Sequence, residues 1–130
     1  MRALLDSGVW FRRYHRLPMS AALRKTLTGV TEWHLASISI AEILYKWRHR
    51  GLPVSNPDEW MEDSLSGLTV QPLSASIARR AALWEWPHGD PADRIIAATA
   101  AELELTLVHT DEVLRELAGF NQVFCRGTGR

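Results

Sequence analysis

Cysteine is almost absent from the sequence, since Cys125 is the only one among 130 residues. A lone cysteine excludes an internal disulfide and a cysteine-ligated zinc cluster, so we expect Cys125 to be a small buried hydrophobe in a late strand. No run of about 18 apolar residues occurs, which argues against a transmembrane helix. The N-terminus reaches Asp6 before any apolar run develops, unlike a secretory signal peptide. These absences predict a cytoplasmic protein that makes no contact with membranes.

Net charge is also missing, because 15 basic residues balance 15 acidic ones. A zero balance gives no overall electrostatic signal for binding nucleic acid. Lysine is nevertheless rare among the basic residues: two are lysines and 13 are arginines, whose planar fork suits phosphate. Both solvated helix faces and phosphate contacts remain open for the arginine clusters. These clusters are Arg12, Arg13 and Arg16; Arg48 and Arg50; and Arg79 and Arg80.

Short apolar runs alternate with stretches of helical periodicity, without repeats or low-complexity segments. This alternation predicts an α/β domain with a parallel sheet. We expect residues 1–130 to form one domain, with a frayed tail at 126–130. The predicted strands are Arg2–Leu5, Leu35–Ser37, Leu68–Leu73, Leu105–Val108 and Val123–Cys125. The predicted helices are Gly8–His15, Ser20–Gly29, Ser39–Arg50, Asn56–Ser64, Ser74–Trp84, Pro91–Glu104 and Asp111–Leu117.

Four carboxylates, Asp6, Glu42, Asp93 and Asp111, follow predicted strands or lie in the first turns of predicted helices. Ligands of open α/β sheets bind outside the carboxyl ends of the strands, so all four acids can gather at one edge. Close carboxylates repel one another, and a cation relieves the repulsion. An all-oxygen site favours Mg²⁺ or Mn²⁺ over zinc, and such an ion suits phosphodiester cleavage by an activated water.

A purely structural role as a helix cap explains Glu42 more easily than Asp6. Ser39 and Glu42 match S-x-x-E, the pattern of a helix capping box. Asp6 lies at a strand end, where a capping role is less obvious.

The other two acids can belong to helix starts. Asp90 can cap a helix whose first residue is Pro91, which places Asp93 at the third position, where a carboxylate suits the helix dipole. Asp111 can begin its helix in the same way, with Thr110 as the cap. Each acid alone is therefore ambiguous, and the interpretation as a site depends on all four occurring together.

Four segments, in this order and spacing, resemble the PIN-domain family and in particular VapC-like toxins of type II toxin–antitoxin systems. The resemblance covers nearly the whole chain. The segments are Leu4-Leu5-Asp6-Ser7 followed by Val9-Trp10; Ser37-Ile38-Ser39-Ile40-Ala41-Glu42-Ile43; Gly89-Asp90-Pro91-Ala92-Asp93-Arg94-Ile95-Ile96-Ala97-Ala98-Thr99-Ala100; and Leu107-Val108-His109-Thr110-Asp111.

The resemblance implies a three-layer α/β/α domain with a parallel sheet of order 3-2-1-4-5. It further implies an endoribonuclease that depends on Mg²⁺ or Mn²⁺. The family's catalytic and metal-binding acids carry over onto Asp6, Glu42, Asp93 and Asp111, with Ser7, Asp90 and Thr110 as auxiliary candidates. Relatives often end the last motif in Thr-x-Asp, whereas this chain has His109-Thr110-Asp111, which leaves the role of Thr110 open.

The same resemblance implies partners. The substrate would be RNA, and a small antitoxin would wrap the protein and place a basic side chain in the acidic pocket. Operator DNA would be contacted only through the antitoxin complex. A homodimer is also implied, and the stretch Asn56–Ser64, with Trp60 and Met61, could supply apolar contacts for it.

Other functions fit the sequence less well. A haloacid-dehalogenase-type phosphatase needs a second aspartate two residues after the first, where this chain has Gly8. A receiver domain needs a phosphoacceptor aspartate after a middle strand, where Ser74 stands. Two alternatives remain, a non-catalytic binding module of the PIN fold and a metal-dependent nuclease that acts on DNA. The histidines His15, His34, His49, His88 and His109 show no metal-ligand spacing and are predicted to be structural or surface residues.

Overall fold

The computed structural model describes residues 1–51, 56–87 and 89–129, so His88 and Arg130 lie outside the described residues. No helix in the described ranges is long and apolar enough to cross a membrane.

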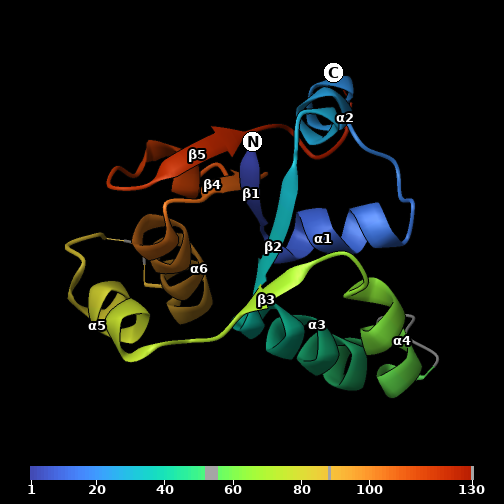
Figure 1. Cartoon of the computed structure of the whole chain (residues 1–130), viewed down its shortest axis with the longest axis horizontal. Helices are drawn as coiled ribbons and strands as arrows, with labels where there is room; N and C mark the ends of the chain where they lie inside the picture. Colours follow the sequence, from blue (N-terminus) through green and yellow to red (C-terminus); the bar gives the residue numbers. More distant parts are fainter. Residues whose placement is uncertain (52–55, 88, 130) are drawn as a thin grey trace.

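A five-stranded parallel sheet of order β3-β2-β1-β4-β5 forms the centre of the structure (Figure 1). The central strand β1 (Arg2–Leu5) pairs with β2 (Glu32–Ala36) on one side and β4 (Thr106–His109) on the other. β3 (Thr69–Gln71) and β5 (Asn121–Phe124) form the two edges. The predicted fold class and strand order are therefore confirmed.

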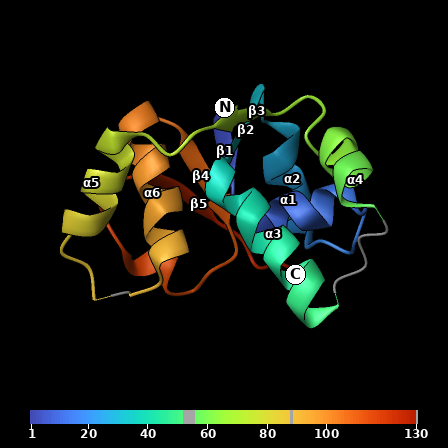
Figure 2. The same cartoon turned by 90° about the horizontal axis from the view of Figure 1, so that it is seen from below.

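Helices cover both faces of the sheet. α1 (Ser7–Tyr14), α2 (Ala21–Thr28) and α4 (Pro57–Ser64) lie on one side. α6 (Pro91–Leu103) packs on the other, with α5 (Ala75–Leu83) against its outer side. Figure 2 shows these three layers.

α3 (Ser37–Arg50) follows β2 directly and contacts both α1 and α6. It therefore continues beyond the carboxyl end of β2 and lies beside α1, which Asp6 caps, and α6, which contains Asp93.

The core is divided by the pleat of β1. Ala3 and Leu5 are buried in the cluster that contains α1, α2 and α4, whereas Leu4 is buried against α6. Successive side chains of a strand point to opposite faces, so a strand covered on both faces is apolar throughout. This burial explains why Arg2–Leu5 was predictable to the residue.

Most predicted elements differ from the structure by one to three residues at their ends, and two of the differences have a clear cause. β2 extends back to Glu32 because its pairing with β1 matches Arg2 with Glu32, and it ends at Ala36, so Ser37 belongs to a helix. The predicted helix Asp111–Leu117 is a single 3₁₀ turn, η1 (Leu114–Glu116). Only 11 residues, 110–120, join β4 to β5, and a crossover with a full helix takes about a dozen or more.

Trp60 belongs to the core, which corrects its predicted part in a dimer contact. Asn56 caps α4 through a hydrogen bond from the Glu59 N–H, and Trp60 is only 6% exposed. Its ring packs 5.0 Å from that of Trp10, and Met61 packs against the same cluster. Because Trp60 is covered by its own chain, it has little surface to offer a second copy.

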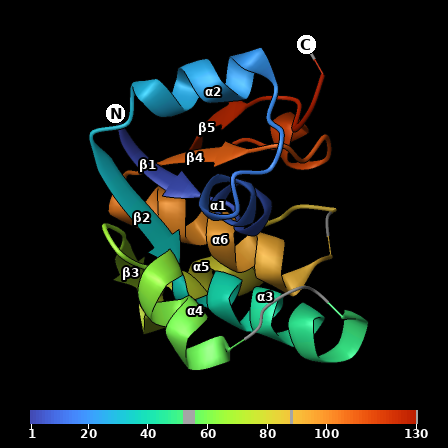
Figure 3. The same cartoon turned by 90° about the vertical axis from the view of Figure 1, so that its right-hand side faces the viewer.

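The C-terminal segment packs against α2 (Figure 3). The Ser20 hydroxyl donates to the Arg126 carbonyl at 2.6 Å, and the Ser20 N–H donates to the Gly127 carbonyl at 3.0 Å. Cys125, buried directly after β5, lies 3.5 Å from the Thr26 hydroxyl. These contacts restrain the first two residues of the segment predicted to be frayed.

Candidate functional site

Asp6 is the residue at which the central strand ends and a helix begins. Its carboxylate Oδ1 accepts a hydrogen bond of 2.7 Å from the Val9 N–H, so Asp6 is the N-cap of α1. A second backbone N–H, that of Thr110, also donates to this carboxylate. The sequence did not make this capping role obvious, because α1 begins at Ser7 rather than at Gly8.

The surroundings of Asp6 make its charge costly. Burial is the main cause that raises the pKa of Asp6 from 3.8 to about 6, and the negative charges of Asp93 and Asp111 raise it further. The hydrogen bonds from the Val9 and Thr110 N–H groups act in the opposite direction but do not prevail. Three acids from β1, α6 and the end of β4 are thus electrostatic neighbours, as expected at the carboxyl edge of a parallel sheet.

Glu42 is joined to this edge through Ser7. The Ser7 hydroxyl donates to Glu42 Oε1 at 2.6 Å and lies 2.9 Å from the Ser39 hydroxyl. The predicted capping box is wrong, because α3 begins at Ser37 after Ala36, which makes no side-chain cap hydrogen bond. Glu42 is therefore the sixth residue of the helix, beyond the first turn, and the buried Ser39 faces Ser7.

Asp90 and Asp93 occupy the start of α6, as predicted. Asp90 Oδ1 accepts hydrogen bonds from the Ala92 and Asp93 N–H groups, at 2.9 and 3.3 Å, and Pro91 opens the helix. Asp90 is exposed and acts as the N-cap, whereas Asp93, at the third position, is partly buried near Asp6.

Asp111 is held on both its main chain and its side chain. Asp111 Oδ1 accepts hydrogen bonds from Val113 N–H at 2.7 Å and Leu114 N–H at 3.4 Å. The side chain that caps the turn is thus that of Asp111 and not, as predicted, that of Thr110. The Asp111 N–H donates to Nδ1 of His109, a buried residue whose pKa is lowered, mainly by burial.

The donor set at this edge fits a hard divalent cation. The carboxylates of Asp6, Asp93 and Asp111 supply oxygen alone, and their mutual repulsion is the cost that a cation would remove. Among the described residues, no three acidic, histidine or cysteine side chains are grouped closely enough to hold an ion as they now lie. Binding therefore requires the carboxylates to turn toward a common point.

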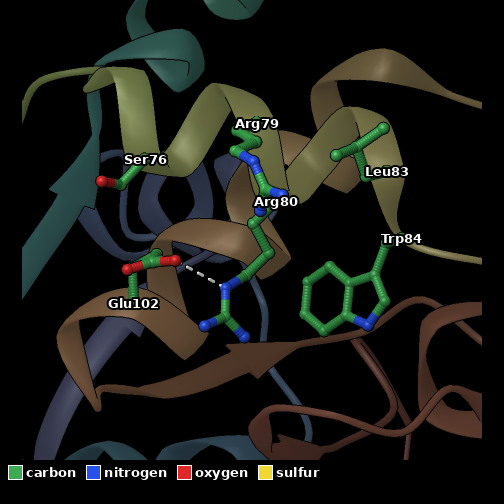
Figure 4. A pocket seen from close by; sticks show the side chains of 6 residues that line it. All are labelled: Ser76, Arg79, Arg80, Leu83, Trp84 and Glu102. Atoms are coloured by element: carbon green, nitrogen blue, oxygen red, sulfur yellow. Dashed lines mark hydrogen bonds and ion pairs between the residues drawn. The ribbon is translucent and has the colours of Figure 1, made fainter.

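A hollow of about 330 Å³ lies between α5 and the C-terminal part of α6, away from the acidic edge, the carboxyl edge of the sheet where Asp6, Asp93 and Asp111 lie (Figure 4). Arg80 Nε donates to Glu102 at 2.7 Å, and the Arg80 guanidinium lies 5.8 Å from the centre of the Trp84 ring. Arg80 is thus already paired with a carboxylate of its own chain, and none of the four candidate site acids lines the hollow. Its lining residues are Ser76, Arg79, Arg80, Leu83, Trp84 and Glu102.

The chain belongs to the PIN domain family, whose model matches residues 3–120. Its fold is similar to that of VapBC2 from Rickettsia felis bound to a DNA fragment from its promoter, with a TM-score of 0.73 and 17% identity over 95% of this chain and 98% of that one. DNA-bound VapBC from Salmonella typhimurium gives a TM-score of 0.67 and 20% identity, covering 95% of this chain and 98% of that one. FitAcB from Neisseria gonorrhoeae gives a TM-score of 0.67 and 19% identity, covering 95% of this chain and 96% of that one. Comparison with curated proteins finds no match.

The sequence singled out the four acids as candidates but did not show the contacts that hold them. The Ser7–Glu42 hydrogen bond joins residues 35 positions apart, and Ser7 was predicted only as an auxiliary. His109 is buried, within the prediction that the histidines are structural or surface residues. Its hydrogen bond from the Asp111 N–H was not predicted, although its position two residues before Asp111, where relatives often have threonine, was a signal.

Proposed function

We propose that this protein is an endoribonuclease dependent on Mg²⁺ or Mn²⁺, with Asp6, Glu42, Asp93 and Asp111 as the metal-binding and catalytic residues. The convergence of Asp6, Asp93 and Asp111 at the carboxyl edge of the sheet carries this proposal. Membership of the PIN family supports a nuclease, that is, a hydrolase of phosphodiester bonds. A divalent cation bound there would activate a water molecule and offset charge on the phosphate in the transition state.

The chain's own residues prepare the site. The hydrogen bonds from the Val9 and Thr110 N–H groups fix the Asp6 carboxylate at the end of β1. Ser7 orients Glu42 through the 2.6 Å hydrogen bond between their side chains. Asp90 holds the start of α6 and so places Asp93. These contacts keep the acids at one edge of the sheet, so that their side chains have only to turn toward a common point when the cation and substrate arrive.

Cleavage assays test the proposal. Purified protein is incubated with a panel of structured RNAs in Mg²⁺, in Mn²⁺ and in chelator, beside an Asp111→Asn variant and an Asp90→Asn control. Asparagine preserves a carbonyl oxygen for capping at both positions, so the variants differ in the site rather than in the helix starts. We expect metal-dependent cleavage by wild type and the control, and none by Asp111→Asn.

The outcomes separate the alternatives. The absence of metal-dependent cleavage across the panel would overturn the proposal, and RNA binding without cleavage would favour the non-catalytic module. Equal cleavage of duplex DNA would favour the DNA nuclease.

A small antitoxin protein is the proposed partner of this chain. The structural relatives include a toxin–antitoxin complex from Klebsiella pneumoniae and VapBC-5 from Mycobacterium tuberculosis. We propose that the antitoxin covers the acidic edge with a basic side chain, and that operator DNA is contacted only through the complex. We also propose that the protein is cytoplasmic and a homodimer. A monomeric mass in solution at micromolar concentration would contradict the dimer.

A further inference from the structure

His109 is the last residue of β4 and stands two residues before Asp111, one of the acids at the acidic edge. Its side chain is fully buried, and its carbonyl accepts a hydrogen bond from the Cys125 N–H, which fixes the main chain at that point. Asp93 and Asp111 are near enough for their charges to act on the imidazole. A buried polar ring at this position requires partners for both nitrogens.

Both nitrogens have partners, and the partners define the tautomer. The Asp111 N–H can only donate, so His109 Nδ1, 3.1 Å away, must accept. The proton of the neutral ring is then on Nε2, which donates to Gln122 Oε1 at 2.7 Å. Neither nitrogen is left to bind a metal ion or to accept a proton from water.

The hydrogen-bond chain continues to a second backbone group. Gln122 Nε2 donates to the Leu117 carbonyl at 2.7 Å, which fixes the orientation of the Gln122 amide. The chain therefore runs from a backbone donor, Asp111 N–H, through His109 and Gln122 to a backbone acceptor, Leu117 C=O. Because the N–H at one end can only donate and the carbonyl at the other can only accept, only one tautomer of His109 and one orientation of the Gln122 amide complete the chain of hydrogen bonds. The two ends bracket the turn η1, which Asp111 caps with its carboxylate.

We propose that His109 is a positioning residue that holds Asp111 in place through the acceptor at Nδ1, with Gln122 fixing the tautomer. The proposal rests on the proposed function, in which Asp111 is a metal ligand. Threonine, which the family resemblance places at this position, can also accept an N–H two residues ahead with its side-chain oxygen. The imidazole supplies the same hydrogen bond from a longer side chain, which also reaches β5.

Two amide substitutions separate the nitrogens of His109. In His109→Asn the side-chain oxygen can take the place of Nδ1 and accept from Asp111, but nothing reaches Gln122. In His109→Gln the side-chain nitrogen can take the place of Nε2 and donate to Gln122, but the acceptor for Asp111 is lost. Both variants bury an amide in place of an imidazole, so the cost of burial is matched.

His34 provides a control elsewhere in the sheet. It is also buried, and its Nδ1 lies 3.0 Å from the side-chain amide of a glutamine, Gln71. His34→Gln therefore repeats the chemical change in a strand pair that does not carry Asp111.

The measurements are Mn²⁺ affinity by calorimetry, melting temperature, and exchange of the Asp111 amide hydrogen by NMR. We expect His109→Gln to weaken Mn²⁺ binding by about 10-fold or more and to accelerate exchange at Asp111. His109→Asn should bind Mn²⁺ within about threefold of the wild-type affinity, because its side-chain oxygen still accepts the hydrogen bond from the Asp111 N–H that holds this ligand in place. His34→Gln should leave the Mn²⁺ affinity and the exchange of the Asp111 amide unchanged.

Equal affinity and equal exchange in His109→Asn and His109→Gln would overturn the proposal, whatever their melting temperatures. If the wild type itself binds no Mn²⁺, the proposed function fails, and the exchange data alone decide whether His109 holds Asp111. Faster exchange in His109→Gln but not in His109→Asn supports the positioning role, and equal exchange overturns it.

Discussion

Asp6 has two roles that make opposite demands on its charge. As the N-cap of α1 it accepts hydrogen bonds from the N–H groups of Val9 and Thr110, and these favour the carboxylate anion. As a neighbour of Asp93 and Asp111 in a buried setting, it is favoured as the neutral acid. The second influence is larger, since the pKa lies near 6.

The raised pKa predicts how stability without metal depends on pH. The folded-state pKa of about 6 exceeds the ordinary 3.8, so the stabilisation is complete below pH 3.8 and is lost as pH rises through 6. The loss amounts to at most about 3 kcal/mol. Asp6→Asn keeps a capping oxygen and removes the titration, so in chelator at pH 8 it should melt a few degrees above wild type, with no such gain at pH 4.

Melting curves of both proteins at pH 4, 6 and 8, with chelator and with excess Mg²⁺, check this prediction. Mg²⁺ should stabilise wild type and have little effect on Asp6→Asn, because a ligand stabilises only the state that binds it. A variant that melts below wild type in chelator, yet gains as much from Mg²⁺, would show that Asp6 is only a cap.

Asp90 should behave as a cap without a share in metal binding. Asp90→Ala removes the acceptor of the Ala92 and Asp93 N–H groups and should lower the free energy of unfolding by about 1 kcal/mol, whereas Asp90→Asn should change it by only a few tenths. Urea denaturation measures the difference. A 10-fold loss of Mn²⁺ affinity in Asp90→Asn would instead place this carboxylate in the metal site.

One arginine of α6 donates hydrogen bonds to three carbonyls at the end of α5 and just after it. Arg94 donates to the carbonyls of Ala81 at 2.8 Å and Trp86 at 3.3 Å, and also to that of Trp84. Arg94→Met leaves three carbonyls without this donor and should lower the free energy of unfolding by about 2 kcal/mol, measured by urea denaturation. Arg79→Met, an exposed residue of α5, is the control, and equal losses in the two variants would contradict the prediction.

Elements whose bounds follow from a local sequence pattern were predictable, and those whose bounds depend on pairing with a distant segment were not. Arg2–Leu5 and the cap and end of α4 follow from local patterns alone. The start of β2 at Glu32 follows from its register with β1, which no local pattern contains. The helix predicted from Asp111 lacked room, since β5 returns after 11 residues.

The same division applies to the candidate site. Strand ends and helix starts in the sequence were enough to select Asp6, Asp93 and Asp111, because the topology of a parallel sheet brings such positions together. The capping box at Ser39 and Glu42 was wrong because α3 starts two residues earlier and turns both side chains toward Ser7. The link from His109 through Gln122 depends on the pairing of β4 with β5.

For the whole protein, the proposed function predicts toxicity that depends on the acids. Induced expression should arrest bacterial growth, and co-expression of the neighbouring upstream reading frame should relieve the arrest. Asp111→Asn, expressed to the same level, should be harmless, since it lacks a charge of the acidic edge but retains a capping oxygen. Growth curves and viable counts measure the effect. Harmless expression of folded wild-type protein would contradict the toxin assignment and leave the nuclease assignment to the cleavage assay.

The central position of β1 has a consequence for the order in which the molecule is completed during synthesis. Asp6 leaves the ribosome early, but its neighbour Asp111 follows 105 positions later, and β4 and β5 come from the last quarter of the chain. At about 5–20 residues per second, roughly 5–20 s separate the synthesis of these two residues. Throughout that interval one side of β1 has no strand to pair with, and the acidic edge is incomplete because Asp111 has not been synthesised. A partner that is already present can therefore meet each new chain before the chain is able to bind a metal ion.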